Sequence, residues 1–225
     1  MSADATLPID LATDPIAFDL ASLLSRVAAK PILHARFLNT LSLLEYVGAR
    51  KIYKSQPAGR FSVELLEHVV EEGRHALVLK KLALRLGGDA VKAYDGDALL
   101  AGAEATRYMQ TLDRAAEADL AASGFPVGEA RTWINYLLTT LLIEERADSV
   151  YPVYEPVLAA LGHGLVAAGI VAEEKRHLRE VFESLAQHDP SHRERLERLR
   201  PVEQRAFATL VAAWSKEVDQ LSLGR

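Results

Sequence analysis

Two short stretches decide the fold: Glu72-Gly73-Arg74-His75 and Glu174-Lys175-Arg176-His177. Each is a Glu-x-x-His motif inside a segment with the apolar periodicity of an amphipathic helix. Residues three apart on a helix lie on one face, so each motif presents a carboxylate and an imidazole in the same direction. A single copy would be weak evidence, because glutamate and histidine are common on helices. The presence of two copies of the motif is what indicates a functional site.

A lone glutamate in an apolar run precedes each motif. Glu45 lies in the run 41–49, and Glu144 ends the run 137–144, 27 and 30 residues before the motif glutamates respectively. Either interval suffices for the rest of one helix, a turn and part of a second helix running back. The sequence therefore predicts one helical hairpin used twice, with four antiparallel helices that bring four carboxylates and two imidazoles to one level.

Four carboxylates that face one core require a counter-charge, because burial and mutual repulsion both disfavour their ionised forms. Two divalent cations would balance four glutamates and two neutral histidines. Carboxylate and imidazole ligands without thiolate suit iron or manganese, and the chain contains no cysteine. We therefore predict a dinuclear metal site with six ligands: Glu45, Glu72, His75, Glu144, Glu174 and His177.

Two of these ligands, Glu72 and Glu174, are expected to bridge the ions and to act as the catalytic carboxylates, because each shares a helix with a histidine ligand. Two other residues are candidates for contacts around the ligands. His68 lies one turn before Glu72 on the same face, where either a place beside the metals or an exposed, hydrogen-bonded position fits. Asp148 lies one turn beyond the lone glutamate of the second half and could orient a ligand histidine, with Glu71 and Glu173 as alternatives.

Small and aromatic residues flank the two lone glutamates. Gly48 and Ala49 lie on the face of Glu45, which predicts either space beside the metals or close helix packing. Tyr53 and Tyr151 lie two turns beyond the lone glutamates of their helices. They could be redox-active or border a cavity, or they could pack in the core with a hydroxyl hydrogen bond.

Proline, glycine and capping residues divide the chain into helices, and no strand-like alternation is present, so the predicted class is all-α. We expect a mobile arm at 1–13 and a single helical domain at 14–225, with the metal-bearing bundle at about 31–187 and a helical extension at 190–221. The expected helices cover about 15–29, 32–55, 62–87, 98–122, 128–150, 165–187 and 201–221. The helix at 98–122 should make the crossover outside the metal-bearing four. Pro152 and Pro156 should end the helix before them, and Pro201 should restart the chain after a polar segment.

Composition narrows the class of protein. A chain of 225 residues with 49% hydrophobic content can bury one sizeable core. The net charge is −5 without a large basic block, so neither nucleic acid nor an anionic membrane is indicated. The N-terminus lacks the pattern of a signal peptide, and we expect a cytoplasmic protein without a membrane span.

The order Glu, Glu-x-x-His, Glu, Glu-x-x-His resembles the ferritin-like di-iron carboxylate superfamily. This resemblance covers about 31–187 and implies a ferritin-like four-helix bundle, two iron ions or sometimes manganese at the six positions, and chemistry driven by oxygen or peroxide. Rubrerythrins usually carry a cysteine-ligated iron domain, which is absent here, and Leu79 stands where the ribonucleotide reductase small subunit keeps its radical tyrosine. The extra helix between the two motifs is more similar to the oxygenase and oxidase branch.

The resemblance implies a di-iron oxidase or oxygenase that uses dioxygen on a small or apolar organic substrate, with electrons from a separate donor; a homodimer is compatible with this. Four alternatives stay open. They are a ferroxidase or iron store, manganese-based peroxide removal, a tRNA hydroxylase supported by the arginines of 192–200, and a metal-free bundle acting as a binding module.

Overall fold

The computed structural model describes residues 15–57, 60–160, 162 and 164–223, and in these residues it contains helices and no strand. The predicted arm at 1–13 lies outside the described residues. Two short 3-10 turns, η2 (Gly88–Val91) and η3 (Gly96–Ala98), precede the fourth helix. The α-helices are α1 (Pro15–Ala28), α2 (Pro31–Ser55), α3 (Val63–Gly87), α4 (Gly102–Ala122), α5 (Glu129–Ala160), α6 (Gly164–His188) and α7 (His192–Leu223). The all-α class is thereby confirmed.

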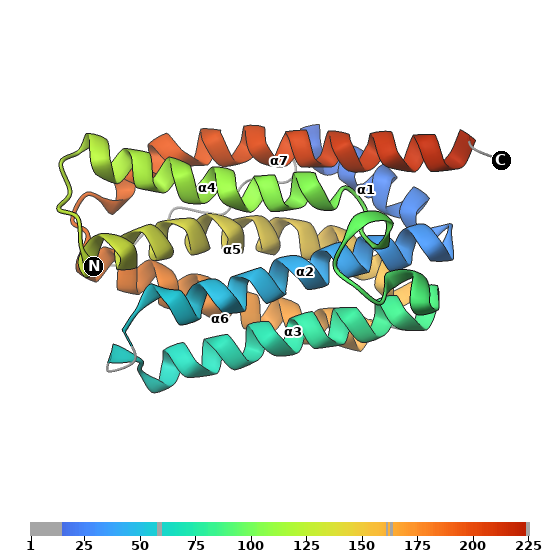
Figure 1. Cartoon of the computed structure of the whole chain (residues 1–225), viewed down its shortest axis with the longest axis horizontal. Coiled ribbons are helices and arrows are strands. Elements are labelled where there is room, and N and C mark those ends of the chain that lie inside the picture. The colour runs from blue at the N-terminus through green and yellow to red at the C-terminus, as the bar shows by residue number, and fades with distance from the viewer. Residues whose placement is uncertain (1–14, 58–59, 161, 163, 224–225) are drawn as a thin grey trace.

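Two helical hairpins form the centre of the molecule. α2 packs mainly against α3, and α5 packs mainly against α6. Figure 1 shows these helices running side by side along the long axis, with α4 and α7 as a further pair beside them. Each hairpin carries one lone glutamate and one Glu-x-x-His motif, so the repeated pattern in the sequence corresponds to a repeated unit of structure.

Local sequence sets the ends of α3 as predicted. The Ser62 side chain accepts a hydrogen bond from the backbone N–H of Leu65 at 3.2 Å, which caps the start of the helix. Gly88 follows the last helical residue with φ of 54°, a left-handed value that favours glycine. Ser62 therefore fixes the start of α3 by satisfying a backbone N–H, and Gly88 fixes its end by adopting a positive φ.

The prediction that Pro152 and Pro156 end the third ligand helix is wrong, because α5 continues through both. Each proline removes one hydrogen bond to the carbonyl four residues earlier. Tyr151, Tyr154 and Leu158 are buried in the same segment, at 5% exposure or less. Packing of these side chains in the core outweighs the two lost hydrogen bonds.

The predicted restart at Pro201 is also wrong, since α7 runs through it without a break. The segment before this proline is not polar on all sides: Leu196 and Leu199 are almost fully buried. Burial of these two leucines holds the first turns of α7 against the rest of the molecule. The crossover helix, α4, begins at Gly102 rather than near 98, because residues 96–98 form η3.

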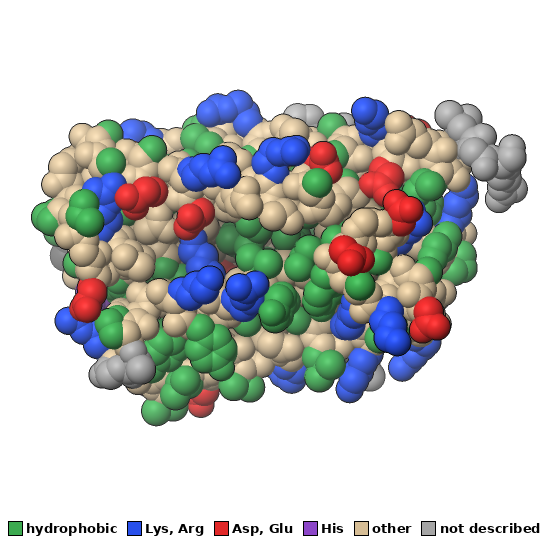
Figure 2. All heavy atoms as spheres, in the orientation of Figure 1, with side chains coloured by type: hydrophobic (Ala, Val, Ile, Leu, Met, Phe, Trp, Pro, Cys, Tyr) green, Lys and Arg blue, Asp and Glu red, His purple; other side chains and the backbone are tan. Residues whose placement is uncertain are grey.

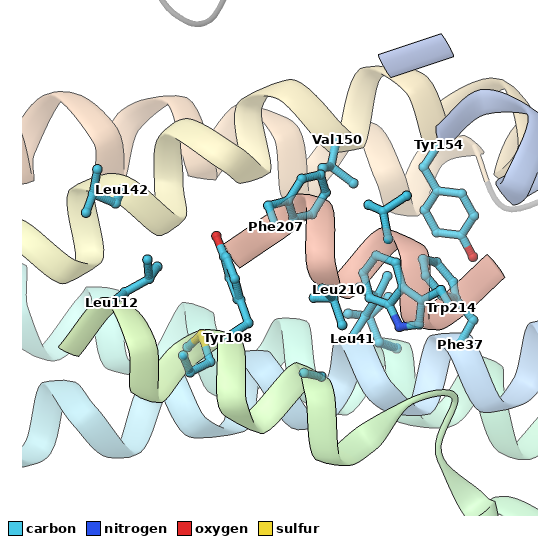
Figure 3. Packing of buried hydrophobic residues seen from close by; sticks show 14 of the residues in the cluster. Phe37, Leu41, Tyr108, Leu112, Leu142, Val150, Tyr154, Phe207, Leu210 and Trp214 are labelled. Atoms are coloured by element: carbon cyan, nitrogen blue, oxygen red, sulfur yellow. The ribbon is translucent and has the colours of Figure 1, made fainter. Parts of the chain in front are cut away.

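α4 and α7 pack against each other and close over the hairpins. Tyr108 of α4 meets Phe207 of α7 at 6.1 Å between ring centroids, and Trp214 meets Phe37 of α2 at 5.1 Å. Figure 3 shows Tyr108, Phe207, Leu210 and Trp214 gathered between the helices. None of the described helices combines the length and apolar character that a membrane crossing requires.

Candidate metal centre

The structure brings the six predicted ligands and His68 together in the core. They form two groups that share Glu72, and within each group one ligand atom from every residue lies within 4.8 Å of the others. The first group is Glu45, Glu72, His75 and Glu174; the second is His68, Glu72, Glu144 and His177. α2, α3, α5 and α6 supply these side chains and α4 supplies none, as expected for a crossover helix. These buried groups are close enough together to bind metal ions.

His68 lies among the ligand atoms and not at the surface. Only 4% of it is exposed, and its Nε2 lies 3.5 Å from a carboxylate oxygen of Glu72 and 3.5 Å from one of Glu144. Its ring stacks on that of His177 with centroids 3.9 Å apart. The spacing of one turn before Glu72 predicted its direction, and the structure resolves the two alternatives in favour of the site.

Unpartnered polar atoms test whether the site fits a metal. Among the described residues, twelve buried side-chain nitrogen and oxygen atoms make no hydrogen bond, and six of them belong to this one cluster. Buried polar groups are normally hydrogen-bonded, so such a concentration needs a cause. The six are atoms that can ligate a cation: His68 Nε2, Glu72 Oε1, His75 Nδ1, Glu144 Oε2, Glu174 Oε1 and His177 Nδ1. The donor set therefore fits divalent metal ions.

The carboxylates of the site repel each other in a dry environment. Burial, followed by the charge of Glu174, raises the pKa of Glu45 to about 7. Burial, followed by the charge of Glu45, raises the pKa of Glu72 to about 7. Burial and the charge of Glu174 likewise raise the pKa of Glu144 well above its ordinary value. Without a cation, some of these carboxylates would have to hold protons at neutral pH.

In Glu174 and His75 the interactions with neighbouring groups outweigh the effect of burial, so their pKa shifts favour the ionised forms. Burial raises the pKa of Glu174, but interactions with Glu144, His177 and His75 outweigh it and hold the pKa well below the ordinary value. Burial lowers the pKa of His75, but the nearby carboxylates, Glu174 first, raise it to about 10. The metal-free site therefore keeps a positive imidazolium beside a negative carboxylate, and a bound cation would replace the proton.

Each ligand histidine is held by a glutamate from the other hairpin. His75 Nε2 on α3 donates to Glu173 on α6 at 2.7 Å, and His177 Nε2 on α6 donates to Glu71 on α3 at 2.8 Å. A carboxylate can only accept, so the proton lies on Nε2 and leaves Nδ1 of the neutral ring free for a metal. Glu71 and Glu173, which directly precede the two motif glutamates, therefore each hold the histidine of the opposite hairpin.

Two arginines form ion pairs with these same two glutamates, again from one hairpin to the other. Arg74 pairs with Glu173, and Arg176 pairs with Glu71 at 2.5 Å. The sequences 71–75 and 173–177 thus share the form Glu-Glu-x-Arg-His, in which every position but the third has a matching role. The ion pairs are partly exposed, so their main effect is to hold the two glutamates in position.

Asp148 lies beside a lysine of α6. Its carboxylate lies 3.9 Å from Nζ of Lys175 on the neighbouring helix. The residue directly before each motif glutamate lies about 100° further round its helix and faces the opposite hairpin, as the period of 3.6 residues dictates. Glu71 and Glu173, the alternatives for orienting the histidines, are therefore the residues that contact them.

We expect Glu71→Gln and Glu173→Gln each to weaken metal binding by about 10- to 100-fold, because a neutral amide no longer supports the basicity of the histidine. The symmetry of the contacts predicts similar losses for the two variants. Competition with a chelator during titration with Mn²⁺ measures the affinity. Glu67→Gln, an exposed position on α3, is the matched control. Unchanged affinity in both variants would show that these hydrogen bonds do not tune the site.

Gly48 lies where the Glu72 carboxylate comes against α2. A Cβ atom at Gly48 would come within 2.9 Å of Glu72 Oε2, closer than real contacts allow. A cavity of about 110 Å³ adjoins this position, and its lining includes Glu45, His68, Glu144 and Glu174. Of the two alternatives predicted for Gly48, space beside the site is the one observed, because Gly48 lines this cavity and a Cβ atom there would meet only the side chain of Glu72.

The two candidate tyrosines lie in different environments, one buried and one exposed. Tyr151 is buried, and its hydroxyl donates to Glu45 Oε1 at 2.6 Å, so it borders both the site and the cavity. Tyr53 is 59% exposed and packs beside Phe61, away from the ligands. Tyr151 lies seven residues beyond Glu144 and so within about 20° of its face, whereas Tyr53 lies eight residues beyond Glu45 and is turned about 80° away from it.

Comparison of the chain with protein-family models, with curated proteins and with solved structures finds no match. The geometry of the site is therefore the basis for assigning a function. Two buried clusters of carboxylate and imidazole side chains share one glutamate and border an apolar cavity. Hydrogen bonds between the two similar hairpins orient their histidines.

Proposed function

We propose that the protein is a non-haem dinuclear metal oxidoreductase with a ferritin-like bundle, which activates dioxygen toward a small or apolar organic substrate. The observation that carries this proposal is the pair of ligand groups sharing Glu72 beside an apolar cavity. An iron pair would supply one-electron steps and reaction with dioxygen, and the protein would supply the ligands and a dry, shaped space.

Glu72 would help to hold both ions, since it belongs to both groups. Glu174 would help to hold the ion of the first group, and its oxygens lie 3.1 Å from His75 Nδ1 and 3.9 Å from His177 Nδ1. Tyr151 keeps Glu45 oriented by donating to it. The sequence has no cysteine and no flavin or nicotinamide motif, so electrons would come from a separate donor.

The same ligands also suit manganese, which keeps peroxide removal as a second candidate. The arginines of 192–200, which favoured a tRNA substrate, are largely engaged by acids of the folded chain. Arg195 and Arg198 pair with Asp119 at 2.7 and 2.6 Å, and Arg200 pairs with Glu145 at 2.6 Å. These arginines hold α7 against α4 and α5, which gives them a structural role within the chain.

Rapid mixing of the anaerobic Fe(II)-loaded protein with oxygenated buffer tests the proposal. We expect iron oxidation much faster than for Fe(II) in buffer, and we expect Glu144→Ala to lose this acceleration while Glu67→Ala retains it. Oxidation at the rate of free Fe(II) would contradict the proposal. Rapid peroxide consumption by the manganese form, together with slow oxidation by the iron form, would instead favour the second candidate.

A further inference from the structure

A second, more open hollow lies next to the cavity at the metal centre. A hollow of about 410 Å³ lies between α2, α4 and α5, and two side chains, Lys51 and Met109, line both this hollow and the inner cavity. Figure 2 shows a depression between α4 and α2 with hydrophobic side chains inside it and Lys and Arg side chains near one end. Lys51 and Met109 therefore separate the inner cavity from the outer hollow.

Positive charge gathers at the outer hollow. Its lining includes Arg50, Lys51 and Lys54 against one acid, Asp113, for a local charge of +2 in a chain of net charge −5. Arg50 and Lys54 are exposed, whereas Lys51 is largely covered and pairs with Asp113. Burial lowers the pKa of Lys51, although Asp113 partly offsets this. An anionic group would find several donors here and would relieve the excess charge.

The inner cavity has the opposite character away from the metal ligands. Leucine, isoleucine, valine and aromatic side chains from α2, α4, α5 and α7 form its walls. Among them are Leu44, Ile143, Val150, Phe207 and Leu210. Such a lining favours a hydrocarbon group, because burial of apolar surface drives its transfer from water.

α2 borders both compartments, because Glu45 and Gly48 line the inner cavity and Arg50 and Lys54 line the outer hollow. Glu45, Gly48, Lys51 and Lys54 follow at intervals of three residues, so each lies about 60° further round the helix and Lys54 lies on the side opposite Glu45. The helical rise places Lys54 about 14 Å from Glu45 along the axis. The two side chains at the junction, Lys51 and Met109, are unbranched and flexible, so a narrow guest can displace them.

We propose that the site takes an amphiphile with a single anionic headgroup and an apolar tail. Arg50, Lys51 and Lys54 hold the headgroup in the outer hollow, and the tail passes Met109 into the cavity beside Glu45 and the other ligands. The chemistry done on such a molecule depends on the function proposed above, but its binding does not. The position of Glu45 relative to the lysines places a carbon well along the tail, and not the headgroup, next to the metal centre.

Isothermal titration of the full chain with amphiphiles of one tail length tests the headgroup. We expect dodecanoate to bind at least about tenfold more tightly than dodecan-1-ol or dodecyltrimethylammonium, since charge-assisted hydrogen bonds are worth about that factor or more. Dodecyl phosphate in parallel shows whether a carboxylate or a phosphate headgroup is preferred. Equal binding of the anionic, neutral and cationic probes would overturn the proposal.

Three variants locate the bound molecule. Lys51→Ala and Lys54→Glu should each weaken dodecanoate by several-fold to tenfold, whereas Lys81→Glu, which changes the charge at an exposed position on α3, should not. Met109→Trp should weaken dodecanoate far more than hexanoate, because it blocks the junction and leaves the outer hollow open. Unaltered melting temperatures establish that the variants fold. If neither lysine variant weakens binding more than Lys81→Glu does, the proposal is wrong.

Titration of metal-free and Mn²⁺-loaded protein separates this inference from the proposed function. Selective dodecanoate binding by a chain that retains no metal would support the binding site and contradict the function. A chain that binds metal and oxidises Fe(II) rapidly but shows no preference for the anionic probe would support the function and contradict the binding site.

Discussion

We expect replacement of Glu72 by alanine to abolish the binding of metal ions at this site. Glu72 is the one side chain common to the two ligand groups, so its loss leaves each group with three ligands and removes one of four negative charges. We expect the affinity of the chain for Mn²⁺ or Fe²⁺ to fall by more than about 100-fold, beyond the effect of losing a residue that merely supports a ligand. Metal content by mass spectrometry after desalting, together with calorimetric titration, measures the loss.

Two further variants make the result interpretable. Glu72→Gln keeps the volume of the side chain and avoids a cavity, and we expect it to lose metal while folding normally. Glu67→Ala on the exposed face of α3 should retain full metal content. Because the buried Glu72 carboxyl has a raised pKa, its neutral replacement should not destabilise the metal-free protein at neutral pH. Full metal occupancy in Glu72→Gln and Glu72→Ala would contradict the shared position of this residue.

We expect the stability of the metal-free protein to fall as the pH rises from about 5 to 8. Glu45 and Glu72 have pKa values of about 7 in the folded chain against an ordinary 4.5, so they stabilise the fold below 4.5 and lose that contribution as the pH rises through 7. His75, with a pKa of about 10 against an ordinary 6.5, adds a decline above 6.5. The lowered pKa of Glu174 acts only under acidic conditions, where its contribution disappears as the pH falls below its ordinary value.

Divalent metal should reverse this trend. A cation replaces the protons of the site, so the stabilisation it provides grows as the proton concentration falls. Chemical denaturation at pH 5.5 and pH 8 with EDTA, and again with Mn²⁺, gives the four free energies of unfolding. We expect a loss of a few kcal/mol between the two pH values without metal, since one pKa unit corresponds to about 1.4 kcal/mol. A metal-free stability that is constant or rises over this range would contradict the assigned protonation states.

The clustering of these carboxylates and imidazoles could be predicted from the sequence because much of their arrangement is local. Glu72 and His75 share a face through helix geometry alone, and the same is true of Glu174 and His177. The lone glutamates then fix the partner helices, since an ionised carboxylate in an apolar run needs a buried counter-charge. His68 satisfied the same geometry, but an imidazole fits the surface as well as a metal site, so spacing alone could not decide between them.

Features that depend on contacts between helices could not be predicted in this way. Whether Glu71, Glu173 or Asp148 orients the histidines depends on the rotation of α3 and α6 relative to each other. The prolines of α5 and α7 remain inside helices because buried side chains around them outweigh the local preference. The wall of the cavity includes Met109 and Phe207 from α4 and α7, helices that carry no ligand and therefore gave no sign of their role in the sequence.

The central claim is that two similar hairpins hold two metal ions around one shared glutamate. X-ray diffraction from crystals of the Fe(II)-loaded protein, with data collected on both sides of the iron absorption edge, tests it most directly. We expect two anomalous peaks, one among Glu45, Glu72, His75 and Glu174 and one among His68, Glu72, Glu144 and His177, with the Glu72 carboxylate between them. A single peak, or no peak in this core while the helices keep the arrangement described above, would contradict the claim.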